Sequence, residues 1–233
     1  VYIQMKQNSI YSGDLILVNA SFQFRTENKS ILVPVDDQFP DILVNKKLAD
    51  AYQNIMMEIH AQNKIVPVSG YRSHDEQTAL FDSSLKENGK EFTYKYVALP
   101  DHSEHQTGLA LDVGINQENI DFIRPDFPYD GIAQDFRNTA PKSGLVERYG
   151  KEKEEITGIS HVPWHFRYVG CPHAEYIAEH NLCLEEYIDI IKKYTKENPL
   201  KYHHYNIYYK KTITSLDTVF SGNNVDGFIV TKE

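Results

Sequence analysis

Cysteine is scarce in this chain of 233 residues, with Cys171 and Cys183 as its only thiols. They form no CxxC or other zinc-ribbon spacing, and two thiols in so long a chain imply no disulfide framework. We therefore predict that both are structural. Long apolar runs are absent as well. None approaches the roughly 18 residues that a membrane-spanning helix needs, so the sequence predicts no transmembrane segment.

Positive charge is also in short supply. The chain has 24 Lys and Arg against 33 Asp and Glu, so its formal net charge is −9. Nucleic-acid binders neutralise phosphates with clustered Lys and Arg, which this sequence lacks, and we predict no nucleic-acid partner. A hydrophobic fraction of 41% with 12% aromatic residues supports a packed core and argues against disorder. The expected partner is a small molecule.

Residues 1–13 contain no positively charged stretch followed by an apolar one, which is the pattern of a secretory leader. This favours a cytoplasmic location. The sequence begins with Val1, however, so an extracytoplasmic protein whose leader has been removed is the alternative.

Hydrophobic periodicity and turn chemistry predict a series of helices and strands. Apolar residues recur every three or four positions over residues 45–63, which indicates an amphipathic helix. Ser73 and Glu76 have the spacing of a capping box, so a second helix is expected from there to about Glu87. Residues 116–142 are expected to form a surface loop that contains a helix over residues 132–139. A further helix is expected over residues 184–194. Strands are expected over residues 14–19, 65–68, 94–99, 109–113 and 166–169.

The composition changes after Pro199 to Tyr-rich alternating segments, which indicate a small β extension. We therefore predict an α+β fold in which residues 1–198 form the main domain and residues 199–233 a C-terminal β extension. The main domain should contain a mixed or antiparallel central sheet with flanking helices. We expect His173 and His180 to be exposed on a helix surface.

A candidate metal site begins with His105 and Asp112. They can converge if Gly108 permits a tight bend and the following strand brings Asp112 to the same edge. Imidazole and carboxylate are suitable Zn²⁺ ligands, and His165, next to a predicted strand, is the candidate third ligand. Three ligands would leave a fourth position for water, as in catalytic zinc sites. The alternative is a capping Asp with two hydrogen-bonded histidines.

Several motifs resemble a known family. The chain is similar to the zinc metallopeptidases that include the vancomycin-resistance D,D-carboxypeptidases and D,D-dipeptidases, related in fold to lysostaphin-type enzymes and the hedgehog signalling domain. The resemblance spans about residues 14–194. The motifs that carry it are Ser69-Gly70-Tyr71-Arg72-Ser73 with Gln77, Ser103-x-His105-x-x-Gly108-x-Ala110-x-Asp112, and Pro163-Trp164-His165-Phe166-Arg167-Tyr168-Val169-Gly170.

The resemblance implies a zinc site and the residues around it. His105, Asp112 and His165 would bind Zn²⁺ on one face of the sheet, with helices against the other face. Arg72 would stabilise the charge that develops on the scissile carbonyl, the role of a fixed cation at an oxyanion. The other motif positions would bind substrate, with Ser103 at the terminal carboxylate; these are Ser69, Tyr71, Gln77, Ser103 and Trp164.

One position departs from the family pattern. Relatives carry Glu three residues before the last zinc ligand as the general base, whereas this chain has Val162, which cannot move a proton. Adjacent His161 is a candidate base, although neighbouring residues of an extended segment point to opposite faces. Three accounts stay open. His161 or a carboxylate such as Glu154 or Glu155 acts as the base, the site binds without turnover, or Val162 is an inactivating change.

Ser69 bears on the substrate. A free D-Ala-D-Ala dipeptide has an ammonium group close to the scissile bond, and some dipeptide-cleaving relatives carry Asp at this position. Ser favours longer substrates, so the resemblance implies removal of terminal D-alanine from peptidoglycan precursor peptides, with dipeptide cleavage as a second activity. The competing class is a catalytically impaired zinc-binding or peptidoglycan-recognition module.

Overall fold

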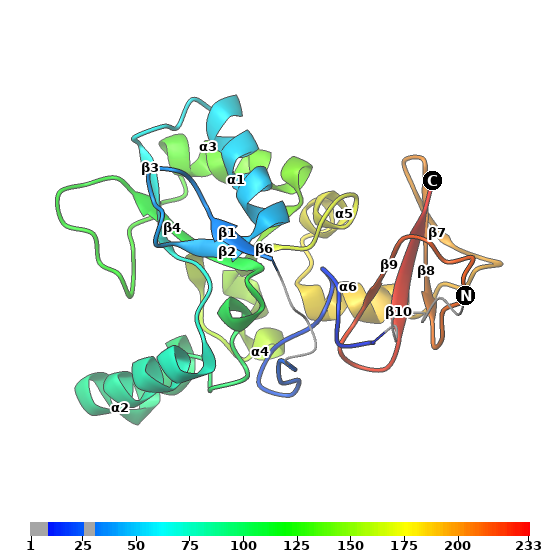
Figure 1. Cartoon of the computed structure of the whole chain (residues 1–233), viewed down its shortest axis with the longest axis horizontal. Helices are drawn as coiled ribbons and strands as arrows, with labels where there is room; N and C mark the ends of the chain where they lie inside the picture. The colour runs from blue at the N-terminus through cyan, green and yellow to red at the C-terminus, as the bar shows by residue number, and fades with distance from the viewer. Residues whose placement is uncertain (1–8, 26–30) are drawn as a thin grey trace, which may run out of the picture.

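The computed structural model describes residues 9–25 and 31–233 of the chain. The prediction about a leader concerns residues that lie largely outside these ranges. Figure 1 shows two separate sheets with helices α5 and α6 between them. The helices are α1 (Lys46–Glu58), α2 (His74–Tyr96), α3 (Gly131–Thr139), α4 (Glu154–Thr157), α5 (His173–Glu179) and α6 (Leu184–Ile191), with short 3₁₀ helices at Glu104–Thr107, Ala140–Ser143 and Lys151–Lys153.

The main sheet has the strand order β3-β4-β6-β5, and every neighbouring pair is antiparallel. The predicted α+β fold is confirmed, and of the two predicted sheet types the structure has the antiparallel one. Asp112 pairs with Ser69 on one side and with His165 on the other. Because directly opposed residues share a face of a sheet, these three side chains lie together. The strands are β3 (Ile65–Ser69), β4 (Ala110–Ile115), β5 (Leu145–Tyr149) and β6 (Val162–Tyr168).

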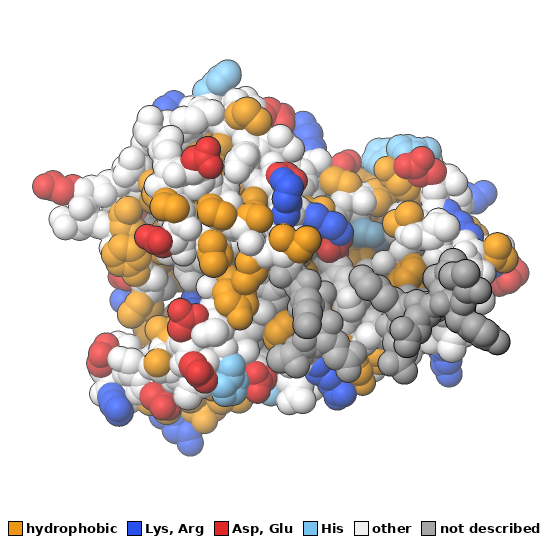
Figure 2. Space-filling model, in the orientation of Figure 1, with side chains coloured by type: hydrophobic (Ala, Val, Ile, Leu, Met, Phe, Trp, Pro, Cys, Tyr) orange, Lys and Arg blue, Asp and Glu red, His pale blue; other side chains and the backbone are white. Residues whose placement is uncertain are grey.

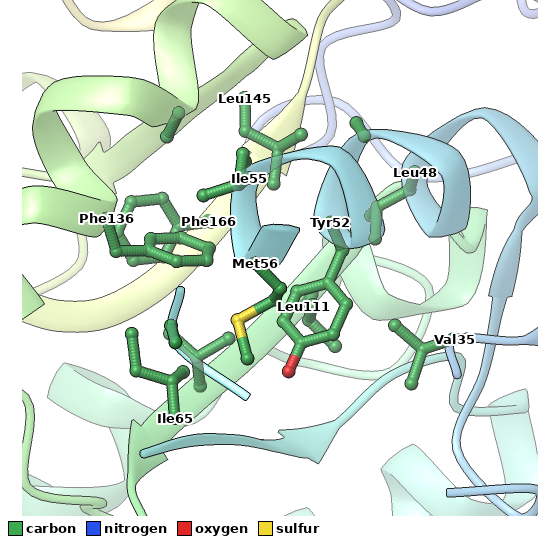
Figure 3. Close-up of a cluster of buried hydrophobic side chains, with 14 of the residues drawn as sticks. Val35, Leu48, Tyr52, Ile55, Met56, Ile65, Leu111, Phe136, Leu145 and Phe166 are labelled. Carbon is green, nitrogen blue, oxygen red and sulfur yellow. The ribbon is translucent and has the colours of Figure 1, made fainter. Parts of the chain in front are cut away.

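The opposite face of the main sheet packs against α1 and α3. Leu111 and Val113 of β4 alternate with Asp112 and enter the same buried cluster as Tyr52 and Ile55 of α1. Figure 3 shows this cluster, in which Phe136 of α3 meets Phe166 of β6. The helix α1 begins where its sequence pattern predicts, because the Asn45 side chain accepts a hydrogen bond from the Lys47 amide. Helices on one face thus leave the polar face of the sheet for chemistry.

Helix α2 begins with the predicted capping box, in which Ser73 and Glu76 each satisfy a backbone amide of the other. The prediction that this helix ends near Glu87 is wrong. The helix is kinked at Gly89 and continues to Tyr96. Gly89 has a φ of 78°, a conformation that glycine adopts without strain and that reads in sequence as a stop. The strand predicted over residues 94–99 is therefore wrong, because residues 94–96 are helical and residues 97–99 join no sheet.

The strand predicted over residues 14–19 is also wrong. Leu15 to Val18 are almost fully buried, so the apolar pattern correctly marks a core segment. Its polar backbone groups, however, bond to side chains and loops instead of a strand ladder. The Arg167 guanidinium donates to the carbonyls of Asp14 and Ile16, and Asn224 donates to that of Leu17.

The second sheet is formed by the C-terminal residues in the order β7-β8-β10-β9. Its strands are β7 (Leu200–Tyr202), β8 (Tyr205–Lys210), β9 (Phe220–Gly222) and β10 (Phe228–Lys232). Ile207 and Ile229 share a buried cluster with residues of α5, α6 and the N-terminal segment, so this sheet packs on elements that precede Pro199. A third, two-stranded sheet pairs β1 (Leu32–Pro34) with β2 (Leu43–Asn45).

The histidine expected on a helix surface at position 173 is buried. His173 contacts the Tyr187 hydroxyl through Nδ1 and the Thr231 hydroxyl through Nε2, so it joins α5, α6 and β10. The burial arises because the C-terminal sheet covers this side of α5, which the local sequence does not reveal. None of the helices in the described residues has the length and apolar character required to cross a membrane.

Candidate metal centre and cleft

His105, Asp112 and His165 meet on the polar face of the main sheet, as predicted. Their candidate ligand atoms all lie within 4.8 Å of one another. His105 Nε2 lies 3.2 Å from one carboxylate oxygen of Asp112, and His165 Nδ1 lies 2.8 Å from the other. Ligand atoms bound about 2.1 Å from a tetrahedral zinc ion lie about 3.4 Å apart, so this arrangement fits a zinc ion after small adjustments.

The backbone around the first ligand depends on two glycines. Gly108 follows the short helix that carries His105, and its φ of 73° turns the chain into β4. A Cβ at this position would also lie 2.8 Å from Leu32 Cδ2. The carbonyl of Gly70 accepts a hydrogen bond from His105 Nδ1 at 2.6 Å. Since a carbonyl can only accept, Nδ1 carries the proton and Nε2 keeps its lone pair for a metal.

The ionised carboxylate of Asp112 and the neutral ring of His105 suit a cation between the three groups. Burial opposes ionisation of Asp112, but His105 and His165 hold the pKa of its carboxyl well below the usual range. Burial lowers the pKa of His105, so its neutral form is favoured. Burial acts in the same direction on His165, but hydrogen bonds to Asp112 and Glu104 outweigh it and raise the pKa of that ring. The donor set of two imidazoles and one carboxylate is one that zinc prefers.

The three residues line a cleft of about 440 Å³. Hydrophobic side chains gather on the face shown in Figure 2, between the lobe formed by α2 and the main sheet. Besides the metal centre, the residues around the cleft come from β3 and the turn after it, α2, the loop after β4, strands β5 and β6, and the residues just before β2 and before the first 3₁₀ helix. They include Ile42, Ser69, Tyr71, Arg72, Gln77, Tyr96, Ser103, Phe122, Ile123, Tyr149, Val162 and Trp164.

Arg72 sits at the corner between β3 and α2, as predicted, and its guanidinium is held by two neighbours. It donates to Ser69 Oγ at 2.9 Å and to Gln77 Oε1 at 2.7 Å, while Gln77 donates to the carbonyl of Ala98. Burial lowers the pKa of Arg72, and the carboxylates of Asp112 and Glu76 oppose this change. The cation is therefore fixed beside the metal centre, and Ser69 and Gln77 contact it directly.

The remaining predicted substrate residues also border the cleft. Ser103 is buried next to the metal ligands, Trp164 lies on β6, and Tyr71 is more than a third exposed. The structure thus brings all five predicted substrate-binding residues to one cavity. Their contacts with a substrate stay a prediction.

Val162 faces the cleft and His161 does not. A register shift between β5 and β6 separates the pair Glu147–Phe166 from the pair Tyr149–Val162, which lets both Val162 and His165 reach the cleft. His161 lies instead in a neighbouring groove, where Nε2 contacts the Tyr129 hydroxyl at 2.6 Å and the two rings stack. His161 is thus not among the residues that line the cleft, and its role as a catalytic base stays a prediction that this placement disfavours.

The alternative carboxylates suggested by the sequence do not line the cleft either. Glu154 accepts a hydrogen bond from the His161 amide, and Glu155 is exposed on α4. The cleft carboxylates are Asp41, Glu76, Glu104 and Asp112. Glu76 is engaged at the helix cap, Asp112 in the triad and Glu104 with buried arginines, and Asp41 is exposed.

Sequence reasoning missed the charged residues behind the metal centre. Glu104 is fully buried and contacts His165, Arg148 and Arg167, and Arg148 also binds Glu185 in a bidentate pair. Glu104 lies inside the His105 motif and Arg167 inside the His165 motif, so the sequence did show two charged residues close to the predicted metal ligands. Their pairing joins strands that are distant in sequence, and no local pattern shows it.

The loop after β4 forms one wall of the cleft through Phe122 and Ile123, both exposed. Arg137 of α3 anchors the end of this loop. Its guanidinium donates to the carbonyls of Phe127 and Pro128 and to that of Pro163 on β6. The same side chain pairs with Glu147 and lies over the ring of Tyr129.

Comparisons with known proteins place this geometry in context. The VanY family of D-alanyl-D-alanine carboxypeptidases matches residues 41–171. The bifunctional D-Ala-D-Ala dipeptidase and D-Ala-D-Ala carboxypeptidase VanXYC of Enterococcus gallinarum is 40% identical over 168 residues, which cover 72% of this chain and 87% of that protein. A D-alanyl-D-alanine carboxypeptidase of Enterococcus faecium is 33% identical over 97% of this chain and 77% of its own length.

Solved structures give the same picture. The vancomycin-resistance D,D-dipeptidase VanXYg, in complex with a D-Ala-D-Ala phosphinate analogue, has a TM-score of 0.91 and 52% identity over 95% of this chain and 94% of its own. A mutant of the D,D-pentapeptidase VanY in complex with Zn(II) has a TM-score of 0.65 and 28% identity over 75% of this chain and 98% of its own.

Proposed function

The chain belongs to the VanY family of D-alanyl-D-alanine carboxypeptidases, and on that basis we propose that it is a zinc peptidase that removes the C-terminal D-alanine from peptidoglycan precursor peptides ending in D-Ala-D-Ala. Relatives with these activities are named for vancomycin resistance. We propose a role in vancomycin resistance for this chain too, because the peptide left after the proposed reaction no longer ends in D-Ala-D-Ala.

The observation that carries the proposal is the triad of His105, Asp112 and His165 in a cleft that also holds Arg72. When bound there, zinc would supply a Lewis acid and an acidified water. The chain itself supplies a guanidinium fixed by two hydrogen bonds, which stabilises negative charge developing on the carbonyl oxygen of the substrate. Because the site is largely buried, this interaction is stronger than it would be in water.

Exopeptidase specificity requires a group that recognises the terminal carboxylate of the substrate. Ser103 is the residue we assign, since it borders the cleft next to His105 and is 3% exposed. Its hydroxyl can donate to a carboxylate. Trp164 and Tyr71, which also line the cleft, provide apolar surface for the methyl groups of the two D-alanine residues.

We propose that peptides longer than the dipeptide are the preferred substrates. A free dipeptide has an ammonium group next to the scissile bond, and Ser69 provides no charge to bind it. The Ser69 hydroxyl instead accepts a hydrogen bond from Arg72. The loop residues Phe122 and Ile123 extend the cleft with apolar surface that a longer peptide can contact. Dipeptide cleavage is the expected second activity.

The test is release of D-alanine from a synthetic peptide ending in D-Ala-D-Ala, assayed beside the free dipeptide and a peptide ending in L-Ala. We expect zinc-dependent release from the D,D-peptide, slower release from the dipeptide and none from the L-Ala peptide. Chelation should stop the reaction, and His105→Ala should reduce bound zinc well below one per chain. Stoichiometric zinc in that variant would contradict the assigned site.

A second function is favoured by one specific observation, the apolar side chain of Val162 at the cleft. General-base catalysis contributes typically 10²–10⁴-fold, so a protein without the base can bind zinc and D-Ala-D-Ala peptides while turning them over slowly. Comparison of the wild type with Val162→Glu separates the two functions. Turnover in both supports the peptidase, whereas tight peptide binding without turnover in either supports a recognition module. Turnover that appears only in the variant identifies a disabled hydrolase.

A further inference from the structure

Glu104 lies directly behind the metal centre and divides its two oxygens between different partners. Oε1 accepts hydrogen bonds from Arg148 Nε and Arg167 Nη1, both at 2.8 Å. Oε2 lies 3.3 Å from His165 Nε2. The carboxylate side chain is fully buried, as are both guanidinium groups. One oxygen therefore neutralises the arginines, and the other is left for the histidine.

We infer that Glu104 is a positioning residue of the metal site, which accepts a hydrogen bond from His165 Nε2–H and so directs Nδ1 toward the ion. This inference rests on the proposed zinc site. His165 has carboxylates at both ring nitrogens, but only Asp112, at Nδ1, belongs to the triad. A metal on Nδ1 requires the proton on Nε2, where the fixed acceptor is Glu104. Acceptors of this kind set the tautomer and orientation of zinc-bound histidines.

A purely structural role for Glu104 accounts for less of the geometry. Each arginine has other acceptors, because Arg148 forms a bidentate pair with Glu185 and Arg167 donates to the backbone carbonyls of Asp14 and Ile16. If charge neutralisation were its only role, nothing would require the second oxygen to face an imidazole nitrogen.

Glu104→Gln tests the inference with little change in shape. The amide oxygen can still accept from both arginines, but the amide nitrogen then faces His165 and cannot accept its N–H. Glu185→Gln is the matched control, because it also removes one carboxylate charge from Arg148 but does not touch the metal centre. Zinc affinity is measured by competition with a chromophoric chelator, and the folded state by circular dichroism. We expect Glu104→Gln to weaken zinc binding by about 10–100-fold and Glu185→Gln to leave it within about 3-fold.

A second measurement needs no substitution and covers the case in which Glu104→Gln fails to fold. In the zinc-loaded wild type with ¹⁵N-labelled histidine, NMR should show His165 protonated at Nε2, with that proton slow to exchange. A proton at Nδ1 of His165, or unchanged zinc affinity in folded Glu104→Gln, overturns the inference about Glu104 but leaves the proposed zinc site in place. Absence of zinc binding by the wild type overturns the zinc site together with the inference.

Discussion

Gln77 accepts a hydrogen bond from Arg72 and donates another to the carbonyl of Ala98, each 2.7 Å long. The glutamine is 1% exposed, so its amide is committed to these two partners. It joins the guanidinium to the segment that follows α2. The orientation of the Arg72 guanidinium in the cleft therefore depends on Gln77, which belongs to α2.

Gln77→Ala should reduce turnover with little effect on zinc content. A hydrogen bond to a charged group contributes about 1.5–3 kcal/mol, so loss of this partner should lower kcat by about 10–100-fold. The measurement is D-alanine release in the wild-type and Val162→Glu backgrounds. Wild-type kcat in Gln77→Ala would mean that Arg72 is oriented by Ser69 alone.

His161→Gln should leave turnover within about 3-fold of the wild type. Its ring stacks on Tyr129 in a groove separate from the cleft, so it is not placed to take a proton from a nucleophile. Arg72→Ala serves as the positive control and should lose at least about 100-fold. A large loss in His161→Gln, together with the disappearance of one ionisation from the pH–rate profile, would restore His161 as the base.

Arg137→Lys should loosen the loop that carries Phe122 and Ile123. Lysine keeps the charge for Glu147 but cannot reach three carbonyls at once, since it lacks the guanidinium fork. We expect faster hydrogen exchange in residues 116–130 and a KM for peptide that is several-fold higher, with a smaller change in kcat. Unchanged exchange in this loop would show that other contacts anchor it.

Acid should destabilise the protein through His173. Burial lowers the pKa of this ring to about 4, whereas the unfolded chain has the ordinary value of about 6.5. The contribution of the neutral ring is thus complete above pH 6.5 and is lost as the pH falls toward 4, up to about 3 kcal/mol. Urea unfolding at several pH values should show a flatter profile over this range for His173→Gln. Exposed His203→Gln is the control and should follow the wild type.

Local patterns predicted the parts of the fold whose causes are local. The periodicity of α1 and the capping box at Ser73 and Glu76 were confirmed because both act within a few residues. The strand proposed at residues 14–19 failed because an apolar run reports burial and not hydrogen-bond partners. The end of α2 failed because Gly89 permits both a stop and a kink.

The candidate site divides in the same way. Motif spacing and resemblance located the three metal ligands and Arg72, and the structure brings them together in one cleft. The partners of Glu104 could not be predicted, since Arg148 and Arg167 come from strands β5 and β6 and meet it only after the sheet forms. The face on which Val162 lies depends on a register shift, which the sequence alone does not specify.

The segment from Asp14 to Leu17 has a consequence for how the protein matures on the ribosome. Its carbonyls are taken by Arg167 on one side and Asn224 on the other. A nascent chain must therefore expose both Arg167 and Asn224 before this segment is held on its two sides. Chains released early would lack these final contacts and would be expected to acquire zinc poorly.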